Sequence, residues 1–128
     1  MLYNIEKQVD MVRHQRIDRI SEEIKKEISR IIRENVKDPR ISQMTSILRV
    51  DVSGDLRHAK VYVSVLGNDQ EKSSTIEGLT RAAGFIRKEL GRVLTIRYIP
   101  ELIFVLDTSI EYSVDISKKI MEVNRNWE

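Results

Sequence analysis

The sequence has no cysteine, only two prolines and few aromatic side chains. The lack of cysteine excludes a disulfide scaffold and thiolate metal sites, and it fits a reducing compartment. Aromatic residues make up 5% of the chain, so the sequence offers no platform on which several bases could stack. The two histidines, His14 and His58, stand far apart without the spacing of metal ligands. We therefore expect neither a disulfide framework nor a metal site.

Long apolar runs and catalytic motifs are missing as well. No stretch approaches the roughly 18 apolar residues of a membrane-spanning helix. Residues 1–10 lack the basic start and apolar centre of a signal peptide, so the expected location is the cytoplasm. The sequence has no Ser/His/acid set, no glycine-rich phosphate loop and no carboxylate pair with a base. We expect no enzymatic activity, no catalytic residue and no cofactor.

What the chain has in abundance is charge. Charged residues fill 33% of its 128 positions, against roughly 25% in an ordinary globular protein. The net charge is only +2, but it is unevenly distributed. Residues 41–100 hold nine basic and six acidic side chains, whereas residues 101–128 hold three basic and six acidic ones. Positive charge is therefore concentrated in the body of the chain. The length of the whole chain suits a single domain.

The first strong pattern is a long amphipathic helix over residues 13–36. Its isoleucines recur mostly at steps of three and four, which places on one helical face Ile17, Ile20, Ile24, Ile28, Ile31 and Ile32. Asp38-Pro39 ends this pattern, because proline disfavours helical geometry in the residue before it. Residues 1–12 have no clear period, and we assign them to a flexible N-terminal lead, with a short helical extension as the alternative.

Three further segments predict strands. Residues 46–53 and 58–66 alternate between apolar and polar side chains and predict a β-hairpin with its turn at Gly54-Asp55. Residues 102–106 are continuously apolar, as expected of a central strand covered on at least one face. A last amphipathic stretch over residues 110–123 predicts a C-terminal helix. The side chains that the second strand is expected to bury are Ala59, Val61, Val63 and Val65.

Between the hairpin and the last strand lies a helical pattern interrupted by Ala82, Ala83 and Gly84. Apolar residues, Phe85 among them, keep a roughly helical spacing on both sides of the interruption. Glycine inside a helix costs about 1 kcal/mol relative to alanine, and small residues let another chain approach the backbone closely. We therefore predict two helices that meet at a bend. A simple packing contact and a helix end are the alternatives.

The elements follow in the order helix, strand, strand, helix, bent helix, strand and C-terminal helix. This order predicts an α+β fold with a three-stranded sheet and helices on one face. We expect the domain to span residues 13–107, with residues 108–128 as a C-terminal helical extension. On the outer face of the hairpin, Tyr62 could stack on a base or serve as an ordinary packing residue.

The bent segment also carries the most one-sided charge. Positions 81–100 hold five basic residues and one acid, and arginine and lysine supply the electrostatic part of RNA affinity. Arg81, Lys88 and Arg92 fall near one helical stripe, whereas Arg87 is turned by about 100° from Lys88. A solvated surface is the alternative for every candidate. The other candidate RNA-binding residues are Arg97 and, at the ends and outer face of the hairpin, Arg40, Arg57 and Lys60.

Four local sequences, taken in their order, resemble the ribosome-binding factor A family. They are KDPRI at 37–41, VSGDLRHAKVYV at 52–63, AAGFIR at 82–87 and LTIRYIPELIF at 94–104. The resemblance spans nearly the whole chain and implies a type II KH fold. KH domains generally hold single-stranded nucleic acid with a Gly-x-x-Gly loop between two helices. The chain has the Ala-x-Gly pattern of the family at that place, which argues against sequence-specific reading of a single strand.

The resemblance implies a noncatalytic RNA-binding factor of the immature 30S ribosomal subunit that acts near the ends of 16S rRNA. It further implies assistance in maturation of the 16S rRNA 5′ end, late small-subunit assembly and importance in cold adaptation. We expect a monomer. One alternative is a protein-interaction module that dimerises through its first helix without specific RNA binding. Another is a small RNA-processing enzyme.

Overall fold

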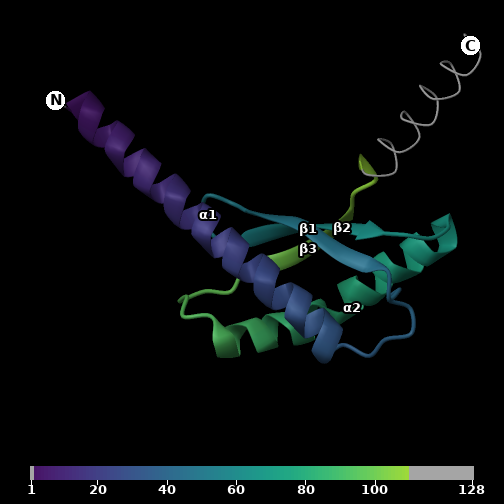
Figure 1. Cartoon of the computed structure of the whole chain (residues 1–128). Helices are drawn as coiled ribbons and strands as arrows, with labels where there is room; N and C mark the ends of the chain where they lie inside the picture. The colour runs from purple at the N-terminus through teal and green to yellow at the C-terminus, as the bar shows by residue number, and fades with distance from the viewer. Residues whose placement is uncertain (1, 110–128) are drawn as a thin grey trace, which may run out of the picture.

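The computed structural model describes residues 2–109 (Figure 1). It confirms the expected α+β fold with a three-stranded sheet. The predicted C-terminal helix over residues 110–123 lies outside the described residues. The elements are, in chain order, α1 (Leu2–Glu34), β1 (Thr45–Val52), β2 (His58–Val65), α2 (Asp69–Val93) and β3 (Glu101–Leu106).

The middle strand of the sheet is β2, with β1 antiparallel on one side and β3 parallel on the other. The apolar run of β3 therefore belongs to an edge strand, and the prediction of a central strand is wrong. Its burial is that of a strand covered on one face, since Leu102 and Phe104 are 7% and 8% exposed and Ile103 is 41% exposed. A run of apolar letters reports on burial and carries no information about which strands are neighbours.

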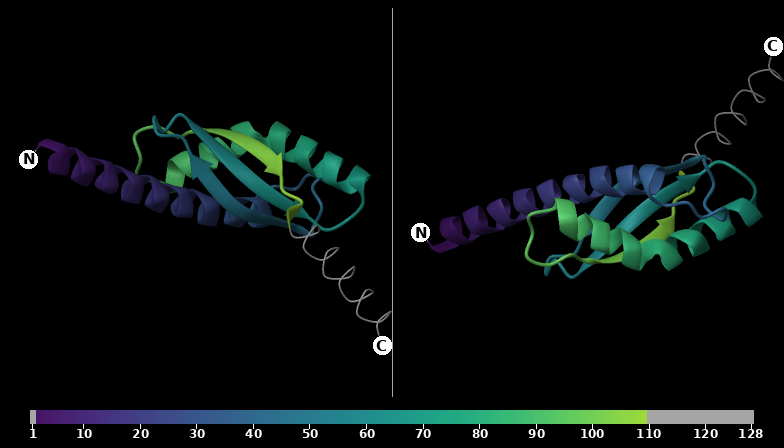
Figure 2. Two further views of the ribbon diagram at one scale, coloured as in Figure 1. Left: turned by 90° about the horizontal axis from the view of Figure 1, so that it is seen from above. Right: turned by 90° about the horizontal axis from the view of Figure 1, so that it is seen from below.

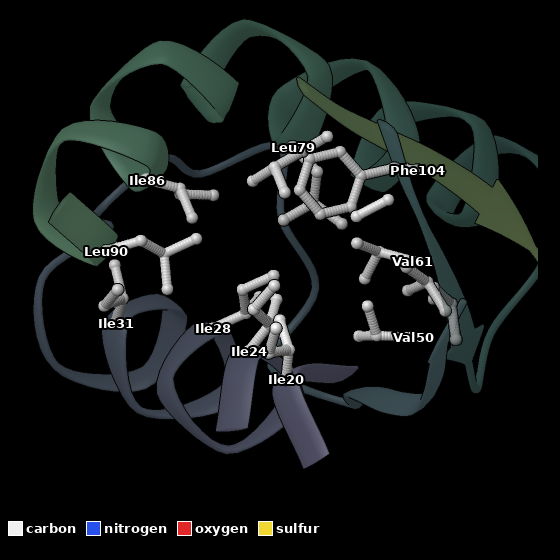
Figure 3. Close-up of a cluster of buried hydrophobic side chains, with 14 residues drawn as sticks. Ile20, Ile24, Ile28, Ile31, Val50, Val61, Leu79, Ile86, Leu90 and Phe104 are labelled. Atoms are coloured by element: carbon white, nitrogen blue, oxygen red, sulfur yellow. The ribbon is translucent and has the colours of Figure 1, made fainter. Parts of the chain in front are cut away.

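Both helices cover the same face of the sheet, as expected, and no other element among residues 2–109 covers the second face, which we call the open face. Figure 2 shows the strands in front in its left view and the helices in front in its right view. Apolar side chains from both layers point toward one another in Figure 3. Burying each large side chain contributes about 1.5–3 kcal/mol. The core consists of Ile20, Ile24, Ile28, Ile31, Val50, Ala59, Val61, Val63, Val65, Leu79, Ile86, Leu90, Leu102 and Phe104.

Helix α1 begins at Leu2, so residues 2–12 are not the flexible lead assigned from the sequence. They form the helical extension that was the alternative. No glycine or proline precedes Pro39, so nothing in the sequence interrupts the helix. The isoleucine face is buried from Ile20 onward, whereas residues 4–16 are exposed and project beyond the sheet (Figure 1).

The connection from α1 to β1 is held against α2. The Oγ1 atom of Thr75 accepts a hydrogen bond from the backbone N–H of Ser42 at 3.1 Å. Gly78 approaches the same connection so closely that a Cβ atom there would stand 2.8 Å from Cγ1 of Ile41. A Cβ atom at Gly84 would meet nothing within 4 Å. The close approach expected at Gly84 therefore occurs six residues earlier, at Gly78.

Helix α2 begins with a capping box. The side chain of Asn68 accepts a hydrogen bond from the backbone N–H of Glu71 at 2.8 Å, and the Glu71 carboxylate accepts one from the N–H of Asn68 at 3.3 Å. This reciprocal pair satisfies two backbone donors that a helix start leaves without partners. Among the described residues, neither helix is long and apolar enough to cross a membrane.

From Asp69 to Val93, α2 is one helix, and the prediction of two helices meeting at a bend is wrong. Ala82 and Ala83 are strong helix formers, so among the three residues of the interruption only Gly84 opposes the helix, by about 1 kcal/mol. Packing outweighs this cost because α2 buries a row of side chains against the sheet and α1. That row contains Leu79, Ile86 and Leu90.

Candidate nucleic-acid interface

The outer face of α2 brings together three of the basic residues singled out in the sequence. Arg81, Lys88 and Arg92 are spaced seven and four residues apart, which places them along one stripe of the helix. All three side chains are exposed on the side of α2 that faces away from the sheet. We call these three residues the basic stripe.

Two glutamates lie beside the basic stripe. Glu77 is 3.2 Å from the Arg81 guanidinium, and Glu89 is 3.8 Å from that of Arg92. Exposed ion pairs of this kind are worth at most about 1 kcal/mol, so a phosphate can displace them. Within residues 2–109, Lys88 has no ion pair or hydrogen bond. The centre of the stripe therefore carries a cation that is ready to bind an anion.

Arg40 lies near the N-terminal end of the basic stripe, because Arg40 and Arg81 share an ion-pair partner. Glu77 is 3.7 Å from Arg40 as well as 3.2 Å from Arg81. The Arg40 side chain also donates to Asp38 at 3.1 and 2.9 Å. This side-chain hydrogen bond is the main reason why the pKa of Asp38 is lowered and that of Arg40 is raised. Arg40 thus orders the connection between α1 and β1 while standing near the stripe.

Arg87 points elsewhere and holds a loop. Its guanidinium donates to the carbonyl oxygen of Pro100 at 3.1 Å and to that of Ile99 at 2.9 Å. These bonds fasten the connection between α2 and β3 to the side of the helix. Arg87 therefore does not join the basic stripe, in agreement with its displacement of about 100° from Lys88.

The three remaining candidates are exposed but do not extend the stripe. Lys60 lies on the open face of the sheet, opposite the helices. Arg57 is in the turn between β1 and β2, and Arg97 is in the connection between α2 and β3. The backbone N–H of Glu101 donates to the carbonyl of Arg57 at 2.8 Å, so that turn meets the start of β3.

Tyr62 is engaged within the protein. The guanidinium of Arg49 lies 4.0 Å from the centre of its ring, on the neighbouring strand. Arg49 in turn is 3.4 Å from Asp51. One face of the ring is therefore covered, which favours the packing role over the stacking role. Residues 2–109 also contain no group of three or more acidic or histidine side chains placed to hold a metal ion.

The sequence reasoning missed Phe85, which it counted with the apolar residues of the helix. The structure leaves Phe85 exposed on the outer face, next to the basic stripe. The signal was its spacing: Phe85 comes four residues after Arg81 and three before Lys88, whereas its neighbour Ile86 is in register with buried Leu79 and Leu90.

Comparison with known proteins adds a family to this geometry. A family model described as ribosome-binding factor A matches residues 16–120. A ribosome-binding factor A of Caldanaerobacter subterraneus subsp. tengcongensis is 56% identical over 110 residues, which cover 86% of this chain and 90% of that protein.

Solved structures show the same fold. The solution structure of a Thermotoga maritima protein assigned to ribosome-binding factor A is 36% identical, with a TM-score of 0.62 over 67% of this chain and 81% of that one. A homology model of the Thermus thermophilus ribosome-binding factor A, fitted into a cryo-EM map of its 30S complex, is 23% identical, with a TM-score of 0.57 over 68% of this chain and 90% of that one. The shared fold is KH-like.

Proposed function

This chain belongs to the ribosome-binding factor A family, and we propose that it binds the immature 30S ribosomal subunit through the outer face of α2. The basic stripe carries this proposal, because it gathers Arg81, Lys88 and Arg92 on a face free of the sheet. Cations on one face are what a phosphate backbone requires. The Thermus thermophilus relative, whose homology model was fitted into a map of its 30S complex, supports association of this chain with the small subunit.

We also propose the finer role that the family resemblance implies. The protein assists maturation of the 5′ end of 16S rRNA late in small-subunit assembly, and it does so as a noncatalytic monomer in the cytoplasm. Binding without cleavage fits a site built from phosphate-binding side chains. Incubation of the purified protein with precursor 16S rRNA should leave the RNA uncut. Cleavage that follows the protein through repurification would contradict this role.

Reversal of the stripe tests the binding surface. Changing Arg81, Lys88 and Arg92 together to glutamate should abolish co-sedimentation with small subunits and leave the circular dichroism spectrum unchanged, because exposed charges contribute little to stability. The matched control is the triple change of Lys118, Lys119 and Arg125 to glutamate, which alters net charge equally in the acidic C-terminal part. Parental binding by a folded stripe variant, or equal loss in the control, would refute the proposal.

A second candidate function rests on the exposed start of α1. Ile5, Val9 and Val12 are spaced four and three residues apart and are each more than half exposed. Such a row could pair with the same row of a second copy. Sedimentation equilibrium over a wide range of protein concentration would reveal this dimer. A constant monomer mass would exclude it.

A further inference from the structure

An aromatic ring lies beside the basic stripe. Phe85 is 44% exposed, although it lies in a helix whose other large apolar side chains are mostly buried. It follows Arg81 by four residues and precedes Lys88 by three, and residues at these separations are neighbours on a helix surface. The ring is therefore flanked by cations on both sides along the helix axis.

Phe85 is 44% exposed, and the residue before it, Gly84, adds no side chain beside it. Within residues 2–109, Phe85 has no cation or other ring against it. Tyr62 differs in this respect, because Arg49 covers its ring at 4.0 Å. Of the Phe85 and Tyr62 rings, Phe85 is therefore the one that can accept a flat ligand.

Burial does not explain the presence of Phe85. The core obtains its side chains in this part of α2 from Ile86 and Leu90, both fully buried. An exposed aromatic residue among cations has the chemistry of a nucleic-acid site, where the ring stacks on a base and the cations bind phosphates. An unpaired nucleotide exposes the face of its base, whereas bases in a duplex are covered by their neighbours.

We propose that Phe85 stacks on the base of an unpaired rRNA nucleotide, while Arg81 and Lys88 bind the phosphates beside that base. This inference rests on the proposed function and specifies its RNA partner as a single-stranded segment. Stacking accepts every base, so the site selects unpaired RNA without reading its sequence. That behaviour agrees with the lack of a Gly-x-x-Gly loop.

Three substitutions separate stacking from other roles of this side chain. Phe85→Ala and Phe85→Leu should each weaken binding to immature 30S subunits by roughly 5- to 100-fold, and Phe85→Tyr should retain nearly parental affinity. The salt dependence should remain parental in all three, because no phosphate contact is lost. Met11→Ala, a change at another exposed apolar helix position, is the control and should bind as the parent does.

Cross-linking identifies the kind of molecule that residue 85 contacts on the subunit. Full-length protein with p-benzoylphenylalanine in place of Phe85 should react, when irradiated on the subunit, with unpaired nucleotides of 16S rRNA. Adducts with a ribosomal protein, together with full binding by the Phe85→Leu variant, would assign Phe85 to an apolar protein contact and overturn the proposal. Adducts confined to duplex RNA would overturn it as well.

The outcome also distinguishes this inference from the proposed function. If Phe85→Ala binds with parental affinity while the glutamate variant of the basic stripe does not bind, stacking is refuted and the binding surface stands. If the parental protein itself fails to bind small subunits, the proposed function is refuted. Circular dichroism and the melting temperature of each variant show whether it is folded.

Discussion

Gly78 and Gly84 lie six residues apart on α2 in opposite surroundings. Alanine at Gly84 adds a methyl group in open space and should raise the free energy of unfolding by about 0.5–1 kcal/mol through helix propensity. Alanine at Gly78 places Cβ 2.8 Å from Ile41 and 3.3 Å from Arg40, and overpacking of this kind costs about 1–3 kcal/mol. Urea unfolding should therefore move the two midpoints in opposite directions. Shifts of the same sign would contradict this account.

Arg87 is expected to act on stability and not on binding. Arg87→Ala removes the hydrogen bonds to the carbonyls of Ile99 and Pro100 and should lower the free energy of unfolding by about 1–3 kcal/mol. Lys88→Ala should act on binding and not on stability. It should leave the free energy of unfolding unchanged and reduce the slope of log affinity against log salt by roughly 0.7–0.9. Chemical unfolding and small-subunit binding at several salt concentrations measure both effects. A reduced salt slope in Arg87→Ala would place that residue on RNA.

Asp38 should contribute to the acid sensitivity of the fold. Its pKa is lowered in the folded state, chiefly by the hydrogen bond from the Arg40 side chain. A lowered folded pKa gives stabilisation that is complete above the unfolded value of about 4 and is lost as pH falls through the folded value. Melting temperatures measured from about pH 6 to pH 2 should therefore fall less steeply in Asp38→Asn than in the parent. Parallel curves would show that this pair adds nothing.

The sequence predicted the surroundings of a side chain where its neighbours belong to the same helix or strand. The basic stripe followed from the helical period alone. Arg87 and Tyr62 depend on Pro100 and Arg49, which reach them through the fold. Phe85 is a third case. Whether its position on the helix is exposed or buried depends on which side of α2 packs against the sheet and α1.

The element with the clearest prediction is α1. Its first turns make no buried contact, since residues 4–16 are exposed and burial begins at Ile20. Deletion of residues 1–12 should therefore shift the melting temperature by only a few degrees, as expected for loss of less than about 1 kcal/mol. The matched control is Ile24→Ala, which truncates a fully buried core residue and should cost about 2–5 kcal/mol. Comparable losses from the two changes would show that the extension packs on the body.

Periodicity predicted the buried part of α1 and the alternation of β2, because each pattern is repeated over several residues. It failed in the middle of α2, where three small residues were taken for a break. One glycine costs about 1 kcal/mol, which is small beside the packing of a helix of 25 residues. Helix propensity therefore identified Gly84 as an unusual position but wrongly predicted that the helix bends there.

At the scale of the whole molecule, the layered α+β architecture followed from the order of elements, while the strand order did not. The parallel neighbour of β2 is fixed by where α2 returns the chain, and this depends on the packing of two helices on one face. The open face of the sheet and the stripe of α2 thus lie on opposite sides of the protein. RNA bound at the stripe leaves Lys60 and Tyr62 facing away from it.

The parallel pairing of β2 with β3 also sets a time course for folding. It joins His58 to Glu101, 43 positions apart, whereas β1 and β2 are joined by a short turn. Contacts between distant parts of a chain form slowly, because loop closure must precede them. The hairpin and both helices can form early, but the core is complete only when β3 brings Leu102 and Phe104. Leu102→Ala should therefore slow refolding in stopped-flow experiments, and a change confined to the unfolding rate would show that β3 docks after the rate-limiting step.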